Sequence, residues 1–375
     1  MKLEDLEKER DCIPADINFF VKLVEGREFD ASVFDEFSHH ATLGNPFITK
    51  HWLQRRLENA PRSTAWLQVF ADGVMVAIFP FRTSRLFGVL PIATSLRSYL
   101  YDYDDVVMLA SNVERSAALL QVLDFISASR SKIWLIRGVL GSSLPPSMFT
   151  EHRGSMKVIS ERRYKVVTEN DWKASISKRL RKNIEYDIRR LERLGALSLS
   201  VSVKVCDEQL QQLIQMKALN LRAQRRKSVM FAPHYQHELR AMHSDNPGSV
   251  LYLLSLDKEV IAMALCVKHE GYIGYQIPAY SLAHSKYGPS NILLYKLLEH
   301  ELYRQKTLVF DLMRGAEAYK SKWLINGEVD PIFLVTNLPS LLLNIAIWSR
   351  EKLAACKKLL TKHKSSQGKK EAISH

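Results

Sequence analysis

The chain has 375 residues, of which 46% are hydrophobic and 25% are charged. This composition is typical of a globular protein and excludes a largely disordered or fibrous chain, while the length predicts two domains with separate cores. The net charge of +13 arises in residues 166–375, which hold 32 Lys and Arg against 20 Asp and Glu. That excess favours an anionic partner: a phosphate-bearing cofactor, a nucleotide sugar, nucleic acid or an anionic membrane surface.

The first half predicts helices that lead into a hairpin, followed by a further helix and strand. Residues 66–81 form two apolar runs joined by an Asp-Gly dipeptide, which is typical of a two-residue hairpin turn. Apolar residues recur at helical spacing over residues 115–129. The expected elements are helices over 30–37 and 50–57, the hairpin over 66–81, a helix over 115–129 and a strand over 132–136.

The second half repeats this order of elements. Its first helix, over residues 175–194, has apolar residues every three or four positions and seven Lys and Arg on its other faces. One interpretation of those charges is a solvated face on which Glu185, Asp187 and Glu192 pair with the cations. The elements expected next are a strand over 197–205, helices over 207–222 and 232–243, a hairpin over 250–268, a strand over 272–277, a helix over 289–304 and a strand over 307–312.

The four cysteines are too far apart in the sequence to suggest a metal site or a disulfide framework (Cys12, Cys206, Cys266 and Cys356). The first ten residues are too charged for a secretory signal. We therefore expect a cytoplasmic protein without a metal.

The C-terminal region allows two interpretations. Residues 331–349 carry no charge and precede a tail with eight Lys and Arg over 350–370. A last strand over 332–335 with a C-terminal helix docked on the domain is the first. The second is a peripheral contact of that helix with the inner face of the membrane, with Trp348 at the headgroups.

A specific pattern closes the second half. Tyr287-Gly288-Pro289-Ser290-Asn291 begins a helix that contains Leu293-Leu294, and a strand then leads through Phe310-Asp311 into Arg314-Gly315-x-Glu317-x-Tyr319-Lys320. This run resembles the closing segment of GNAT-type acyltransferases of the cellulose-biosynthesis (CelD-like) branch, which are distantly similar to FemAB-type transferases. Pro289-Ser290 stands where that branch commonly has Pro-Gly.

The resemblance implies an α/β (α+β) fold with two tandem GNAT-like domains, each a mixed, mainly antiparallel sheet flanked by helices. The divisions it predicts are an N-terminal domain over 1–165, an acyltransferase domain over 166–338, and a C-terminal helix with a basic tail over 339–375. It implies transfer of an acetyl or longer acyl group from an acyl-CoA to an amine of a sugar or polysaccharide precursor.

The expected site lies around the helix that begins at Pro289. Its free backbone N-H groups favour an anion, so the CoA pyrophosphate is expected there. Candidate residues fall into three groups. Those for the cofactor are Lys286, Gly288, Pro289, Ser290 and Asn291; those for catalysis are Asp311 and Glu317 as bases and Tyr319 as an acid; those for the substrate are Arg225, Arg226, Arg314 and Lys320.

Alternatives remain for these residues and for the donor. Asp311 has the position of a cap at a strand end. The phosphate loop departs from the common Gln/Arg-x-x-Gly-x-Gly/Ala pattern, which keeps open a FemAB-type transferase that takes aminoacyl-tRNA, a ligand suited to the Arg-rich helix. A further alternative is a non-catalytic subunit that binds nucleic acid or a membrane-associated synthase.

Overall fold

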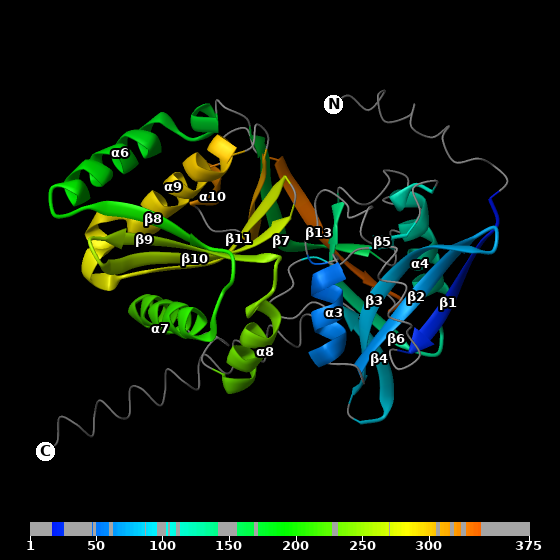
Figure 1. Cartoon of the computed structure of the whole chain (residues 1–375). Coiled ribbons are helices and arrows are strands. Elements are labelled where there is room, and N and C mark those ends of the chain that lie inside the picture. Colours follow the sequence, from blue (N-terminus) through cyan, green and yellow to red (C-terminus); the bar gives the residue numbers. More distant parts are fainter. Residues whose placement is uncertain are drawn as a thin grey trace, which may run out of the picture.

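The computed structural model is an α/β molecule whose two halves lie side by side (Figure 1). It describes residues 17–25, 47, 50–59, 63–86, 88–95, 103, 106–109, 113–141, 156–168, 172–226, 232–269, 271–304, 308–315, 319–323 and 328–338. The helix expected over 30–37 and the expected C-terminal helix lie outside these residues. Within them, every helix is too short or too polar to cross a membrane.

The described strands form one continuous sheet in the order β1-β2-β3-β4-β6-β13-β7-β12-β11-β10-β9-β8, with β5 paired to β3. The strands of the N-terminal half are β1 (Phe19–Glu25), β2 (Thr64–Ala71), β3 (Val74–Leu86), β4 (Leu90–Ser95), β5 (Val107–Met108), β6 (Ile133–Leu140) and β7 (Met156–Thr168). Those of the C-terminal half are β8 (Leu197–Ser202), β9 (Ser249–Leu256), β10 (Glu259–His269), β11 (Tyr272–Tyr280), β12 (Leu308–Arg314) and β13 (Glu328–Thr336).

Each half follows the same plan. Four antiparallel strands are followed by a helix, which is α4 (Arg115–Ala128) in the first half and α9 (Pro289–Arg304) in the second. The helix leads to a strand that runs parallel to the fourth, so that β4 pairs with β6 and β11 with β12. The predicted fold class, two tandem α/β units with mixed, mainly antiparallel sheets, is confirmed.

The last strand of each half is exchanged at the centre of the sheet. β13 pairs with β6 and β7, and β7 pairs with β13 and β12. The two sheets thereby become one, and each half needs a strand of the other to continue its hydrogen bonding. The predicted boundary between residues 165 and 166 falls inside β7, and the division of the chain into domains stays a prediction.

Helices cover both faces of the C-terminal half (Figure 1). α6 (Lys178–Glu192) and α9 lie on one face, and α7 (Asp207–Ala223) and α8 (Pro233–His243) lie on the other. α6 begins where Ser177 Oγ accepts a hydrogen bond from the Leu180 backbone N-H, and its apolar side buries Ile184 and Ile188. Its spacing of apolar residues therefore predicted which side faces the core.

A buried contact between helices joins the two halves. Trp52 from α3 (Lys50–Asn59) packs edge-on against His243 at the end of α8, with 5.0 Å between ring centroids. The Arg55 guanidinium also donates to the Ser244 carbonyl at 3.3 Å. His243 is fully buried, and its Nδ1 lies 2.9 Å from Ser249 Oγ. Packing across this junction therefore encloses a titratable side chain.

Candidate functional site

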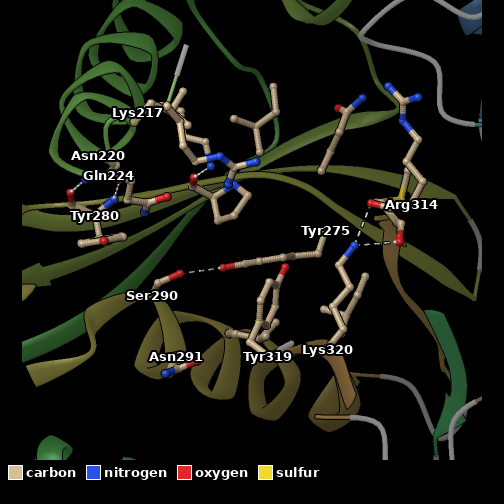
Figure 2. Close-up of a pocket in the computed structure, with 18 of the residues that line it drawn as sticks. Lys217, Asn220, Gln224, Tyr275, Tyr280, Ser290, Asn291, Arg314, Tyr319 and Lys320 are labelled. Carbon is tan, nitrogen blue, oxygen red and sulfur yellow. Dashed lines mark hydrogen bonds between the residues drawn. The ribbon is translucent and has the colours of Figure 1, made fainter. Parts of the chain in front are cut away.

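The candidate site is a pocket where two parallel strands separate. β11 and β12 are paired only between Tyr272–Gly274 and Val309–Asp311, and beyond that point they diverge. The gap holds a pocket of about 630 Å³, whose walls come from both strands, α7, α9 and α10 (Lys320–Trp323) (Figure 2). The separation of these two strands creates the space in which the pocket lies.

The end of β12 is held in a bent conformation. Met313 has a left-handed backbone (φ 61°), which non-glycine residues adopt at a cost. Asp311 Oδ1 accepts from the Met313 N-H at 2.6 Å, and Lys320 Nζ donates to the carbonyls of Met313 and Arg314 at 3.1 and 2.7 Å. These bonds satisfy the backbone groups of the bend, and the bend turns the strand away from β11.

Gly274 on β11 leaves space for the side chain of Met313, the residue at the bend of β12. A Cβ atom at this position would come within 2.6 Å of Met313 Sδ and within 2.7 Å of Val267. Only glycine leaves room for the Met313 side chain against the strand. The separation of the two strands thus depends on a small residue on one and a strained residue on the other.

Asp311, a predicted base, lies outside the pocket lining and is fully buried. Besides the Met313 N-H it accepts hydrogen bonds from the hydroxyls of Tyr272 at 2.7 Å and Tyr103 at 3.2 Å. Tyr103 belongs to the N-terminal half, so this carboxylate ties the halves together at the bend. The contacts favour a structural role, and the catalytic role of Asp311 stays a prediction.

The edge of β11 that faces the pocket is closed by side chains of α7. Lys217 Nζ donates to the Pro278 carbonyl at 2.8 Å. The Asn220 amide donates to the Tyr280 carbonyl at 2.7 Å and accepts from the Tyr280 N-H at 2.9 Å, as a neighbouring strand would. Because Pro278 has no N-H, the edge over residues 278–280 has few backbone groups left for a ligand.

Two tyrosines lie in the middle of the pocket (Figure 2). Tyr275 is 3% exposed, and its hydroxyl lies 3.5 Å from Ser290 Oγ. Burial raises the pKa of Tyr275 well above its ordinary value, so the hydroxyl keeps its proton at neutral pH. Tyr319, the predicted acid, lies beside it in the lining. Both tyrosines belong to the described lining of the pocket.

The charged side chains of the described lining all carry a positive charge. They are Lys217, Arg226, Arg314 and Lys320, and no Asp or Glu accompanies them among the described residues that line the pocket. Three of the four predicted substrate residues, Arg226, Arg314 and Lys320, therefore lie together. Arg225, the fourth, is exposed at the end of α7 and does not line the pocket. Such a lining favours an anionic ligand.

Two of the five predicted cofactor residues line one end of the pocket. Ser290 and Asn291, in the first turn of α9, line it. Gly288 has a left-handed φ of 58° between the short helix η8 (Leu282–Tyr287) and α9, and Pro289 is the first residue of α9. Lys286 is exposed, with its Nζ 5.0 Å from the centroid of the Tyr287 ring. Glu317 lies outside the described residues.

Sequence reasoning missed Lys217, Asn220 and Tyr275. Asn220 is a buried polar residue on an amphipathic helix, which in sequence is a weak signal of a hydrogen bond to another element. Pro278 was a clearer signal, because proline within a strand indicates that the strand has an unpaired edge there. The strand was expected to end at residue 277, and it continues to Tyr280.

Among the described residues no three His, Cys, Asp or Glu cluster as metal ligands would.

Comparisons with known proteins agree with this geometry. Residues 178–321 match the family described as acetyltransferase (GNAT) domain. FemX has a similar structure, with a TM-score of 0.58 at 10% identity over 87% of this chain and 99% of that one. A putative lysylphosphatidylglycerol synthetase domain from Agrobacterium fabrum is also similar (TM-score 0.51, 13% identity, 86% and 96% covered). So is L-PGS from Bacillus licheniformis (TM-score 0.51, 14% identity, 80% and 95% covered).

No curated protein matches this sequence. The identities to the solved structures are low and establish the fold alone. The domain match covers α6 through Ser321 and so contains all of the described pocket lining. The chain thus has a GNAT acyltransferase fold, and its pocket lies in the half that carries the matched domain.

Proposed function

We propose that this protein is an acyl-CoA-dependent N-acyltransferase that transfers an acetyl or longer acyl group to an amine of a sugar or polysaccharide precursor. One observation carries the proposal: the pocket between β11 and β12 is lined by four cations and, among the described lining residues, by no carboxylate. A phosphate-bearing donor matches that charge. The CelD-like resemblance supplies the choice of acceptor.

In this reaction the amine nitrogen attacks the thioester carbonyl, a C–N bond forms, and the C–S bond breaks. Negative charge develops on the carbonyl oxygen and then on the leaving sulfur, which takes a proton. The Tyr275 and Tyr319 hydroxyls supply hydrogen-bond donors in the pocket, and Arg314 adds positive charge. The amine must lose a proton, and Glu317, two residues before Tyr319, is the proposed acceptor.

A second candidate is transfer of an aminoacyl group from aminoacyl-tRNA. The closed edge of β11 favours it, because a pantetheine arm has amides that pair with an open strand edge, and Lys217 and Asn220 occupy that edge over residues 278–280. A short aminoacyl ester does not need this pairing. One similar structure is named a lysylphosphatidylglycerol synthetase, a name that denotes transfer of a lysyl group.

Calorimetric titration with acetyl-CoA and with CoA tests the first candidate. We expect saturable binding that Arg226→Gln weakens by roughly 3- to 10-fold, as the loss of one charge contact of about 1 kcal/mol would. Arg225→Gln is the matched control, since the adjacent arginine does not line the pocket and its loss should leave the affinity unchanged.

Equal weakening by both substitutions would show that general charge, and not the pocket, attracts the ligand. If neither acetyl-CoA nor CoA binds at millimolar concentration, the acyl-CoA proposal is wrong. Aminoacyl-tRNA is then titrated in the same way. Binding of acetyl-CoA is followed by a screen of amino sugars, with release of the CoA thiol as the readout.

A further inference from the structure

The outer face of α6 carries a row of cations that no part of the described chain neutralises. The helix buries Ile184, Ile188 and Leu191, and its opposite side faces solvent at the edge of the C-terminal half (Figure 1). Five exposed cations on that side make no ion pair with any described residue: Lys178, Arg179, Lys182, Arg189 and Arg193. We call these five residues the α6 basic face.

The acidic residues of α6 leave this face unpaired. Glu185 lies 4.0 Å from Arg181, and Asp187 lies 3.0 Å from Arg190. Both of these pairs were expected from the sequence, but they flank the basic face. Glu192, the third acid, is exposed and pairs with no described residue.

The spacing of the basic face places like charges next to each other. Lys178 and Lys182 are four residues apart, as are Arg189 and Arg193, so each pair projects from neighbouring turns of the helix. Like charges at this spacing destabilise a helix. The negative charges of a row of phosphates would neutralise these neighbouring cations. Together with Arg193, α6 extends for roughly 24 Å, which is long enough to contact several phosphates.

An exposed aromatic ring lies within the same face. Tyr186 is 57% exposed, and the Arg190 guanidinium lies 5.5 Å from its ring centroid. The same guanidinium lies 4.7 Å from the ring centroid of Tyr287. The Nζ of the exposed Lys286 also lies over the Tyr287 ring. Tyr287 precedes Gly288, so positive charge continues from α6 to the end of the pocket at Ser290.

We propose that the α6 basic face docks the phosphate backbone of a folded RNA, with Tyr186 available to stack on an unpaired base. Cations interleaved with an aromatic ring are typical of such surfaces. A membrane surface is less well matched, because the exposed side of α6 offers one tyrosine and no row of aliphatic side chains. The inference stands on this face alone and does not depend on which donor enters the pocket.

Fluorescence anisotropy with bulk tRNA as the probe tests the proposal at salt concentrations from about 50 to 300 mM. Wild-type binding should weaken steeply with salt, with a log–log slope near −0.9 for each phosphate contact. The triple variant Lys182→Gln/Arg189→Gln/Arg193→Gln should bind at least about 10-fold more weakly at 100 mM salt. Its slope should be shallower by about 2.7, since three contacts are lost.

The matched control removes three exposed cations outside α6, in Lys22→Gln/Arg85→Gln/Lys204→Gln. It changes the net charge equally and should keep the wild-type affinity and slope. Equal binding of tRNA by wild type and the α6 variant would overturn the proposal, as would equal losses in both triple variants. Equal affinity for duplex DNA of similar length would overturn the assignment to RNA.

Two additional measurements distinguish RNA docking from membrane binding and from donor binding in the pocket. Cosedimentation with phosphatidylglycerol vesicles that depends on the α6 cations, without tRNA binding, would replace RNA by a membrane. Acetyl-CoA titration of the α6 variant should match wild type, so that failure of the RNA proposal and failure of the acyl-CoA proposal are distinguishable. Retained cooperative unfolding of the variant confirms that the helix still folds.

Discussion

His243 at the junction of the halves should make stability depend on pH, and His243→Gln should remove that dependence. Burial lowers the pKa of His243 from 6.5 to about 3, because the enclosed site cannot solvate the charged imidazolium as water does. The folded protein therefore keeps the imidazole neutral between about pH 3 and 6.5, while the unfolded chain binds a proton there. Stability rises with pH in this window and is lost as pH falls below about 6.5.

The size of the effect follows from the two pKa values. Well inside the window each pH unit changes the free energy of unfolding by about 1.4 kcal/mol. The slope is only half as large at pH 6.5, where half of the unfolded chains carry the proton, so acidification from about pH 6.5 to 4.5 should remove about 2 kcal/mol through this residue. Glutamine keeps a side-chain partner for Ser249 Oγ and does not titrate. The difference between wild type and variant in their pH dependence therefore isolates His243, because all other groups are shared.

Urea unfolding at several pH values provides the measurement. Trp52 packs against the imidazole, so tryptophan fluorescence reports on the junction. We expect the wild type to lose about 2 kcal/mol more than His243→Gln over that interval. Parallel pH profiles for the two proteins would refute the reasoning, since they would mean that the imidazole is protonated to the same extent in the folded and unfolded states.

Three other substitutions test the local geometry by urea unfolding. Gly288→Ala should cost about 1 kcal/mol, because the left-handed φ of 58° disfavours a Cβ; a stabilised variant would contradict this. Lys320→Met should cost about 2 kcal/mol by leaving two carbonyls of the β12 bend without their donor, whereas the exposed Lys322→Met should be near neutral. Glu301→Gln should cost about 2 kcal/mol, because the buried carboxylate accepts from Tyr252 and Lys268 at 2.6 Å; a loss no larger than that of Glu299→Gln would refute it.

The sequence pattern was most informative for turns and helices, whose structure depends mainly on residues close together in the sequence. Asp72 and Gly73 have positive φ values of 49° and 81°, the geometry of the two-residue turn that their dipeptide predicted. The apolar spacing predicted α4 and α6, because a helix forms its hydrogen bonds within itself and buries one side. The helix start at Pro289 was likewise predicted from the residue that cannot donate an N-H.

The strands β7, β1 and β4 were not predicted from the sequence. β7 covers a charged stretch for which no strand was expected, and it lies between β12 and β13. Its backbone groups are satisfied by strands from elsewhere in the chain, so its own side chains carry little of the signal. β1 and β4 were missed for the related reason that short strands in a meander depend on their neighbours.

By itself, the sequence determined most of the described helices and hairpins, the two-fold plan of the chain, and the region that holds the pocket, because periodicity, turns and caps are local properties. Only the tertiary structure decided which charged residues meet. Asp311 is buried and accepts hydrogen bonds from tyrosines of both halves. Arg226, Arg314 and Lys320 line one pocket. Lys217 and Asn220 donate hydrogen bonds to the edge of β11. These contacts join residues up to some 200 positions apart in the sequence. They depend on the exchange of β7 and β13 and on the bend of β12, which only the folded chain brings about.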